Sequence, residues 1–230
     1  MRKTRRPYVI CHMGPSIDGR IVTTNWGSVP GHAAAYERTA HTFHADGWII
    51  GRVSMEPYAG KATVPRGKVK RRIPRTDFIA DSEARSYAIA IDPSGKLTWR
   101  SNAIDGEHAI TILSHRVSND YLTFLRSRGV SYLFGGTATI DLRNVLVKLA
   151  RAFGIRTLLL EGGGKINGSF LSADLIDELS VVIAPVADGA IGTATLFDAT
   201  AGRGPSRHLR LISVARLKGD LVWLRYRVRR

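Results

Sequence analysis

The segment TLLLEGGGKI, residues 157–166, carries the clearest chemical signal in the chain. Its first four residues predict a buried strand, and Ile166–Leu175 predicts a short helix after the glycines. Glycines let a backbone approach an anion closely, and the free N–H groups at a helix start attract one. The segment therefore predicts a phosphate-binding turn made by Gly162, Gly163, Gly164, Lys165 and Ile166. It matches neither the Gly-x-Gly-x-x-Gly pattern nor the P-loop, so a plain strand-to-helix turn stays the alternative.

Two acidic residues follow predicted strands. Glu161 ends the strand Thr157–Leu160, where a carboxylate needs a partner such as a ligand amine or hydroxyl. Asp18 belongs to the sequence SIDGRI, which follows the strand Tyr8–Met13. Asp-Gly is also a common turn sequence. Asp18 is therefore a candidate for substrate positioning and proton transfer, with a turn residue as the alternative.

Polar turns follow two further predicted strands. The turn Gly51, Arg52, Val53, Ser54 follows the strand Gly47–Ile50, and Ser114, His115, Arg116 follows Ala109–Leu113. Ligands of open parallel sheets bind beyond the carboxyl ends of the strands. We therefore expect both turns to contact an extended phosphorylated ligand such as a dinucleotide. Arg116 with Ser114 suits a ribose 2′-phosphate, which favours NADP over NAD, and the alternative for Arg116 is a solvated loop arginine.

The remaining pattern predicts the α/β class. Besides the strands above, Tyr87–Ile91, Ser131–Phe134 and Leu179–Ile183 have strand length and composition. Asp141–Phe153 has apolar residues at helical spacing, an acidic cap and a final Gly154. Leu209–Val214 and Leu221–Val228 predict an antiparallel hairpin. We expect a mostly parallel central sheet flanked by helices, in a single domain of residues 1–230 whose residues 1–7 form a basic arm.

Composition narrows the function classes. The chain has 230 residues and a net charge of +15 at pH 7, concentrated at 2–6, 66–75 and 224–230. Such a charge predicts anionic ligands, so a nucleic-acid-binding protein is one alternative. The single cysteine, Cys11, excludes an internal disulfide and fits the cytoplasm. His41 and His44 lack the spacing of metal ligands, so no metal site is predicted. No apolar run reaches the ~20 residues that span a bilayer, so no membrane association is expected.

These motifs together resemble a known family. SIDGRI, GRVS (51–54), LLLEGGG, DLIDEL (174–179) and IAPVADG (183–189) are similar to the reductase domain of the riboflavin-biosynthesis deaminase/reductase. The resemblance implies the dihydrofolate-reductase-like fold, a homodimer, and reduction by NADPH of the ribosyl group of 5-amino-6-(5-phosphoribosylamino)uracil to ribityl. It implies that the glycine turn holds the cofactor pyrophosphate and that Gly51, Arg52 and Ser54 line the cofactor. It also implies that Asp18 and Glu161 face substrate and nicotinamide, with His12 and Ser16 among the substrate residues.

Two positions depart from the family pattern. His12 stands where members that make riboflavin usually carry lysine, and the segment Met55–Lys61 replaces an Asp-Pro-x-Leu-Thr-x-Arg motif that supplies a substrate-phosphate arginine. The zinc motif of the deaminase half is also absent. An NADPH reductase of the same fold that acts on another substrate, such as a pterin, is therefore the main alternative.

Overall fold

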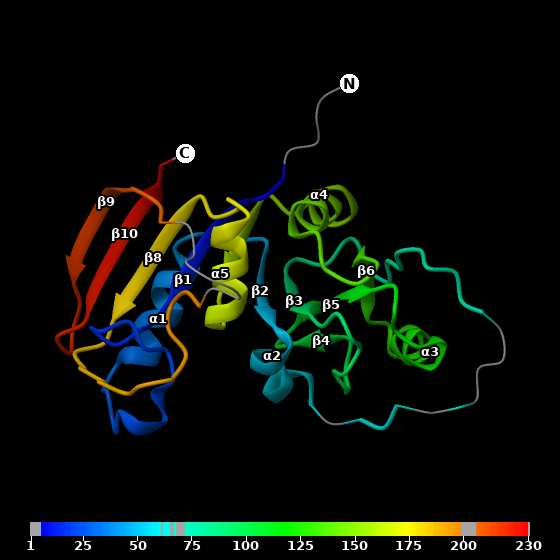
Figure 1. Ribbon diagram of the computed structural model, residues 1–230, viewed down its shortest axis with the longest axis horizontal. Helices are drawn as coiled ribbons and strands as arrows, with labels where there is room; N and C mark the ends of the chain where they lie inside the picture. Colours follow the sequence, from blue (N-terminus) through cyan, green and yellow to red (C-terminus); the bar gives the residue numbers. More distant parts are fainter. Residues whose placement is uncertain (1–5, 61, 65–66, 68–71, 199–205, 230) are drawn as a thin grey trace. The chain divides into compact units, whose positions relative to one another are not determined.

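The computed structural model describes residues 6–60, 62–64, 67, 72–198 and 206–229, which belong to two compact units (Figure 1). The first unit consists of Asp46–Arg156 together with Arg6 and Pro7, and the second combines Tyr8–Ala45 with the chain from Thr157 onward. The expectation of a single domain stays a prediction. Most of the expected basic arm, residues 1–5, lies outside the described residues.

The first unit is built on a mostly parallel sheet. Its strands β2 (Gly47–Gly51), β3 (Tyr87–Ile91), β5 (Glu107–Ser114) and β6 (Ser131–Gly136) are parallel in the order β2-β3-β5-β6, and β4 (Ala103–Ile104) pairs antiparallel with β5. Every residue of β3 is buried, as its unbroken apolar composition requires. The carboxyl ends of β2, β3, β5 and β6 therefore share one edge of the sheet.

Three helices belong to the first unit: α2 (Arg52–Ala59), α3 (Asn119–Arg128) and α4 (Leu142–Phe153). In α4 the Asp141 side chain accepts a hydrogen bond from the Asn144 amide at 3.0 Å, and Gly154 ends the helix in the left-handed conformation. Val145, Leu146 and Leu149 form its buried face. The cap, the apolar spacing and the terminal glycine all match the prediction from sequence.

The second unit carries the glycine turn. Its strands β7 (Thr157–Leu160), β1 (Tyr8–Met13) and β8 (Glu178–Ile183) are parallel in that order, and β10 (Val222–Val228) and β9 (Leu209–Arg216) extend the sheet as an antiparallel hairpin. Its helices are the 3-10 turn η1 (Thr23–Asn25), α1 (His32–His41) and α5 (Gly164–Ser172). Figure 1 shows β10 and β9 beside β8, at the outer edge of this sheet. The carboxyl ends of β7, β1 and β8 share one edge.

The predicted fold class is confirmed: the chain is α/β, with mostly parallel strands, flanking helices and a C-terminal antiparallel hairpin. All the predicted strands are present, but α5 begins at Gly164, two residues before the predicted start, and ends at Ser172. Helices α1, α2 and α3 were not predicted. Within the described residues, no helix is long and apolar enough to cross a membrane.

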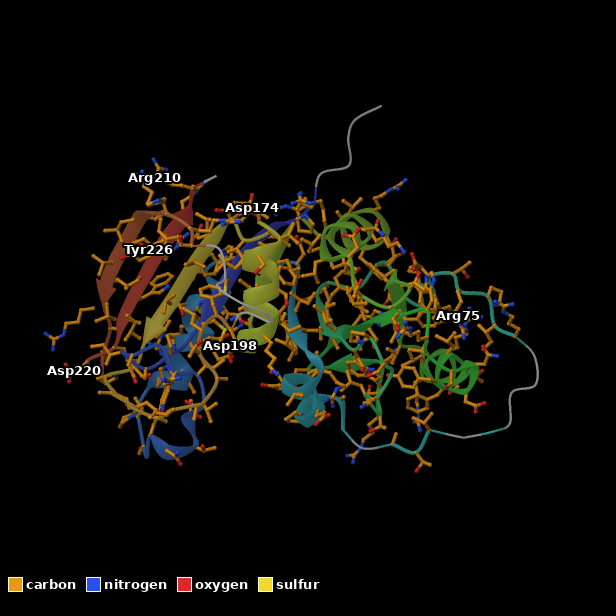
Figure 2. All side chains as sticks on the ribbon, viewed as in Figure 1. Arg75, Asp174, Asp198, Arg210, Asp220 and Tyr226 are labelled. Atoms are coloured by element: carbon orange, nitrogen blue, oxygen red, sulfur yellow. The ribbon has the colours of Figure 1, made fainter. Side chains whose placement is uncertain are left out.

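The basic stretch 66–75 is hydrogen bonded to the rest of the first unit at its described end. The Arg75 guanidinium (Figure 2) donates to the Val117 carbonyl at 2.8 Å and to the Asn119 side chain at 2.9 Å. Arg75 therefore fastens this stretch to the loop before α3 rather than lying free in solvent. Residues 65–66 and 68–71 lie outside the described residues.

Candidate active site

The glycine turn joins β7 to α5 in the second unit. Gly163 is the N-cap of α5, and Gly162 has a φ of +101°, which an L side chain rarely adopts. A Cβ at Gly162 would also lie 3.2 Å from Met13 at the end of β1. The first amides of a helix have no intrahelical acceptor, and the exposed Lys165 adds a positive charge beside them. These features are compatible with an anion at the turn, and anion binding there stays a prediction.

At Gly164 and Gly168, contact with another segment of the protein leaves no room for a side chain. A Cβ there would lie 2.2 Å from the Thr195 carbonyl oxygen, and a Cβ at Gly168 would lie 2.1 Å from the Asp198 carbonyl oxygen. Asp198 (Figure 2) accepts a hydrogen bond from the Thr195 hydroxyl at 2.7 Å. These two glycines let the segment 195–198 pack directly on α5. Close packing against protein, rather than access for a ligand, explains why side chains are missing at these two positions.

Glu161 is half-buried at the end of β7 and is hydrogen bonded to the Tyr36 hydroxyl of α1. Tyr36 also donates to the main-chain carbonyl of His12, over 3.1 Å. Burial, followed by the charge of Glu161, raises the pKa of Tyr36 well above its ordinary value. Burial likewise raises the pKa of the Cys11 thiol, so Cys11 stays protonated at neutral pH and is not a nucleophile. Tyr36 was not among the predicted site residues.

His12 lies in the interior of the second unit. Its Nε2 is 3.1 Å from the Tyr36 carbonyl and its Nδ1 is 2.9 Å from the Ser180 hydroxyl, which accepts from the Trp223 indole at 2.8 Å. A carbonyl only accepts, so we assign the hydrogen to Nε2, and Ser180 then donates to Nδ1. Burial lowers the pKa of His12 to about 4. Both ring nitrogens are therefore bonded within the protein, and this geometry gives no support to the predicted substrate contact.

Asp18 is exposed but fully hydrogen bonded. Its carboxylate accepts from the Ser16 hydroxyl at 2.6 Å and from the amides of Asp188 at 3.0 Å and Gly189 at 2.9 Å. These bonds, that of Ser16 first, hold the pKa of Asp18 well below its ordinary range. An ionised carboxylate that only accepts has no proton to give at neutral pH. The geometry thus favours a loop anchor and disfavours proton donation by Asp18, and it commits the Ser16 hydroxyl to Asp18.

The predicted polar turns of the first unit lie at one edge of its sheet. Gly51 ends β2 and is the N-cap of α2, so Arg52 and Ser54 stand in the first turn of that helix rather than in a loop. Arg52 pairs with Glu56 one turn later. Asp92, buried after β3, accepts from the amides of Lys96 at 2.6 Å and Leu97 at 2.8 Å.

The turn after β5 divides into an anchored and an exposed part. The buried Ser114 hydroxyl donates to the Pro93 carbonyl at 2.6 Å, and its oxygen accepts from the Arg116 amide at 3.3 Å. His115 packs edge-on against Phe134, with 4.8 Å between the ring centres. Arg116 itself is exposed. Ser114 and His115 thus shape the turn, and Arg116 is its exposed charged residue among the described residues.

Among the described residues, no group of three or more histidine, cysteine, aspartate or glutamate side chains is placed to hold a metal ion. In the second unit, the Asp18 carboxylate and both ring nitrogens of His12 are hydrogen bonded within the protein.

The fold and the candidate site define an α/β protein with carboxylates and a glycine turn at the carboxyl ends of parallel strands. The family model described as the RibD C-terminal domain matches residues 7–223, and the chain belongs to this family.

Similar proteins extend this finding. The chain is 28% identical over 195 residues to the 2,5-diamino-6-ribosylamino-4(3H)-pyrimidinone 5′-phosphate reductase of Methanothermobacter thermautotrophicus, covering 84% of each chain. It is 25% identical over 199 residues to the protein of that name from Aquifex aeolicus, covering 83% of this chain and 82% of the other. A pyrimidine reductase-like protein from Corynebacterium diphtheriae has the same fold, with a TM-score of 0.72 at 18% identity over 97% of this chain and 92% of that chain.

A reductase of this family uses a pyridine nucleotide, and the second unit has features that fit one. Gly162 adopts a backbone conformation that an L side chain rarely adopts, α5 begins beside it, and Lys165 is exposed there. The Asn167 side chain is fully buried in α5, donates to the Leu196 carbonyl at 3.0 Å, and leaves its Oδ1 without a partner among the described residues. A pyrophosphate would be held by the amides of Gly163, Gly164 and Lys165, and the bound nucleotide would supply hydride.

Proposed function

We propose that this protein is an NADPH-dependent reductase of riboflavin biosynthesis, which reduces the ribosyl group of a phosphorylated ribosylaminopyrimidine to ribityl. The observation that carries the proposal is the position of Glu161. It follows β7 directly and precedes the glycine turn, in a chain whose family match spans residues 7–223. Hydride then reaches C1′ of the opened ribose while the protein aligns the two carbons and supplies a proton.

The substrate is tested by following NADPH oxidation at 340 nm with three compounds. The first is 5-amino-6-(5-phosphoribosylamino)uracil, and the third is dihydrofolate. The second is 2,5-diamino-6-ribosylamino-4(3H)-pyrimidinone 5′-phosphate, the compound in the name of the two relatives. We expect turnover with a ribosylaminopyrimidine phosphate and none with dihydrofolate. Turnover of dihydrofolate alone would replace this function by the pterin reductase alternative.

We further propose that Arg116 selects NADPH over NADH. It is the exposed charged residue of the turn after β5, where a guanidinium can make charge-assisted bonds to a phosphate. Arg116→Ala should weaken NADPH binding about tenfold or more and leave NADH binding nearly unchanged. Arg85→Ala is the matched control, because Arg85 is exposed in the same unit but precedes β3, at the opposite edge of the sheet. Equal losses for the two cofactors in a fluorescence titration would remove the assignment.

The protein is also proposed to form a homodimer in the cytoplasm. Apolar side chains of the hairpin, on the sheet face opposite His12, remain exposed or half-exposed: Leu209, Leu211, Val214, Leu224 and Tyr226. Tyr226 is labelled in Figure 2. Val214 is 61% exposed and Leu211 is 52% exposed. A second copy would cover these side chains in the same way, because a two-fold interface uses one patch twice.

Light scattering at micromolar concentration should give the mass of a dimer. The double variant Leu211→Lys, Val214→Lys should give a monomer with unchanged circular dichroism, whereas Ala33→Lys, an exposed site on α1, should stay dimeric. A parent protein that is monomeric at this concentration would remove the dimer.

A further inference from the structure

Tyr36 places one hydroxyl between two groups of different hydrogen-bonding character. The His12 carbonyl oxygen, 3.1 Å from the Tyr36 oxygen, can only accept a hydrogen bond. The Glu161 carboxyl group, the second partner, accepts when it is ionised and can donate when it is protonated. Tyr36 and Glu161 are both half-buried.

With these two partners, the Tyr36 hydroxyl can form a hydrogen bond with Glu161 in both protonation states of the carboxyl group. With Glu161 ionised, Tyr36 donates its hydrogen to the carboxylate. With Glu161 protonated, the carboxyl group donates to the Tyr36 oxygen, and Tyr36 turns its hydrogen to the His12 carbonyl. Neither state leaves a polar group of the pair unbonded, which would otherwise cost about 1–3 kcal/mol. A main-chain amide cannot reverse direction in this way.

We propose that Tyr36 is a positioning residue that lets Glu161 gain and lose a proton at the carboxyl end of β7. The inference rests on the proposed function for the reaction that uses this proton. There, the carboxyl proton of Glu161 passes to the imine nitrogen as hydride from the reduced nucleotide bonds to the adjoining carbon. The C=N electron pair moves to nitrogen, the product is a secondary amine, the nucleotide is oxidised, and Glu161 recovers a proton from water.

The ring of Tyr36 is held independently of its hydroxyl. It packs against the His12 ring with 4.3 Å between centres, and the main-chain carbonyl of Tyr36 bonds to His12 Nε2. A Cβ at Gly14 would lie 3.3 Å from the Tyr36 ring and 2.8 Å from His32 Nε2, so the missing side chain at Gly14 gives α1 room to approach. Tyr36→Phe should therefore keep the packing and remove only the hydroxyl.

The other titratable groups near the hydroxyl do not replace Glu161. Cys11 on β1 stays protonated because burial raises its pKa, and His12 stays neutral because burial lowers its pKa to about 4. Burial likewise lowers the pKa of His32. Glu37, on α1 beside Tyr36, is exposed to solvent. Glu161 is thus the group near Tyr36 whose protonation would reverse the direction of the hydrogen bond with the Tyr36 hydroxyl.

The test compares Tyr36→Phe with Tyr8→Phe. Tyr8 is a matched control because its hydroxyl also donates to a glutamate, Glu178, at 3.0 Å, but from the opposite end of β1. In the protein without ligands, the carboxyl carbon of Glu161 is titrated by NMR in ¹³C-glutamate-labelled protein, with Glu161→Gln to assign the signal. We expect its midpoint to rise by roughly one pH unit in Tyr36→Phe, because the ionised form loses a charge-assisted bond, and to stay in place in Tyr8→Phe.

The second readout is the pH profile of NADPH oxidation with the ribosylaminopyrimidine phosphate. Tyr36→Phe should lower kcat by about 10- to 100-fold, move the limb of the profile that reports Glu161, and leave the Kd for NADPH unchanged. An unchanged Glu161 titration in a folded Tyr36→Phe protein would overturn the proposal, whatever its activity. A shifted titration in a protein whose parent reduces none of the substrates would support the pair and remove only the proposed function.

Discussion

Asp18 and Glu161 both follow strands of the second unit, yet their surroundings give them opposite properties. Asp18 is exposed and accepts from the Ser16 hydroxyl and from two main-chain amides, and the two amide N–H groups cannot accept in return. Glu161 is half-buried and bonded to a hydroxyl that can turn. Fixed donors stabilise one protonation state of a carboxyl group, whereas a reversible partner allows both. The kind of donor, more than exposure or position after a strand, separates an anchor from a candidate acid.

The largest expected effect that tests this comparison is that of Glu161→Gln. The amide is nearly isosteric with the carboxyl group but cannot transfer a proton, so we expect kcat to fall by about 100- to 10,000-fold. The Kd for NADPH, measured by fluorescence titration, should change little because the glycine turn is intact. Glu107→Gln is the control, because the Glu107 carboxylate also accepts a hydrogen bond from a hydroxyl of the protein, that of Ser86, at 2.7 Å. A Glu161→Gln enzyme with nearly full kcat would remove the acid role.

His12 provides the next effect, on the free energy of unfolding rather than on turnover. Its pKa is about 4 in the folded protein and about 6.5 when unfolded, so the unfolded state binds more protons between these values. Stability from neutral His12 is therefore complete above pH 6.5 and is lost as the pH falls toward 4. The loss from pH 7 to pH 5 should be about 2 kcal/mol in urea denaturation.

His12→Gln separates this effect from that of the other buried histidines. Burial also lowers the pKa of His32 and His108, and these two residues remain in the variant. The unfolding free energy of His12→Gln should fall less between pH 7 and pH 5 than that of the parent. If the unfolding free energies of parent and variant fell equally between pH 7 and pH 5, His12 would not be the source of the pH dependence.

The same contrast shows what the sequence could and could not reveal. Strand composition, the cap at Asp141 and the glycine turn are local signals, and they predicted the strands, α4 and the position of Glu161. Helix α1 escaped prediction because its buried positions are Ala35, Thr39 and Ala40, which give little apolar periodicity. Helix α3 has a Ser118 cap and a final Gly129 that could have been recognised.

Partners distant in sequence could not be predicted from such local signals. Asp18 bonds to amides 170 and 171 residues further along the chain, and the hydroxyl beside Glu161 comes from α1. The sequence SIDG shows a carboxylate at a strand end, but the identity of its donors depends on pairing between β1 and β8. This is why a turn residue and a proton donor both fit Asp18 until the loop 184–190 is placed beside it.

Asp18→Asn is expected to have the smallest effect on turnover, and it tests the comparison from the other side. An Asn side chain keeps an oxygen for the Ser16 hydroxyl and the Asp188 amide, but presents an NH₂ group to the Gly189 amide, so one of the bonds is lost. We expect kcat within about twofold of the parent, because no proton is transferred at this site. The Tm of Asp18→Asn should be lower than that of the parent at neutral pH.

Because the pKa of Asp18 is lower in the folded protein, the stabilisation by its carboxylate is present above about pH 4 and is lost below it. The Tm values of parent and variant should therefore converge as the pH falls below about 4. A large loss of kcat with an unchanged Tm would instead place Asp18 in the reaction, and the distinction between fixed and reversible donors would no longer separate the two carboxylates.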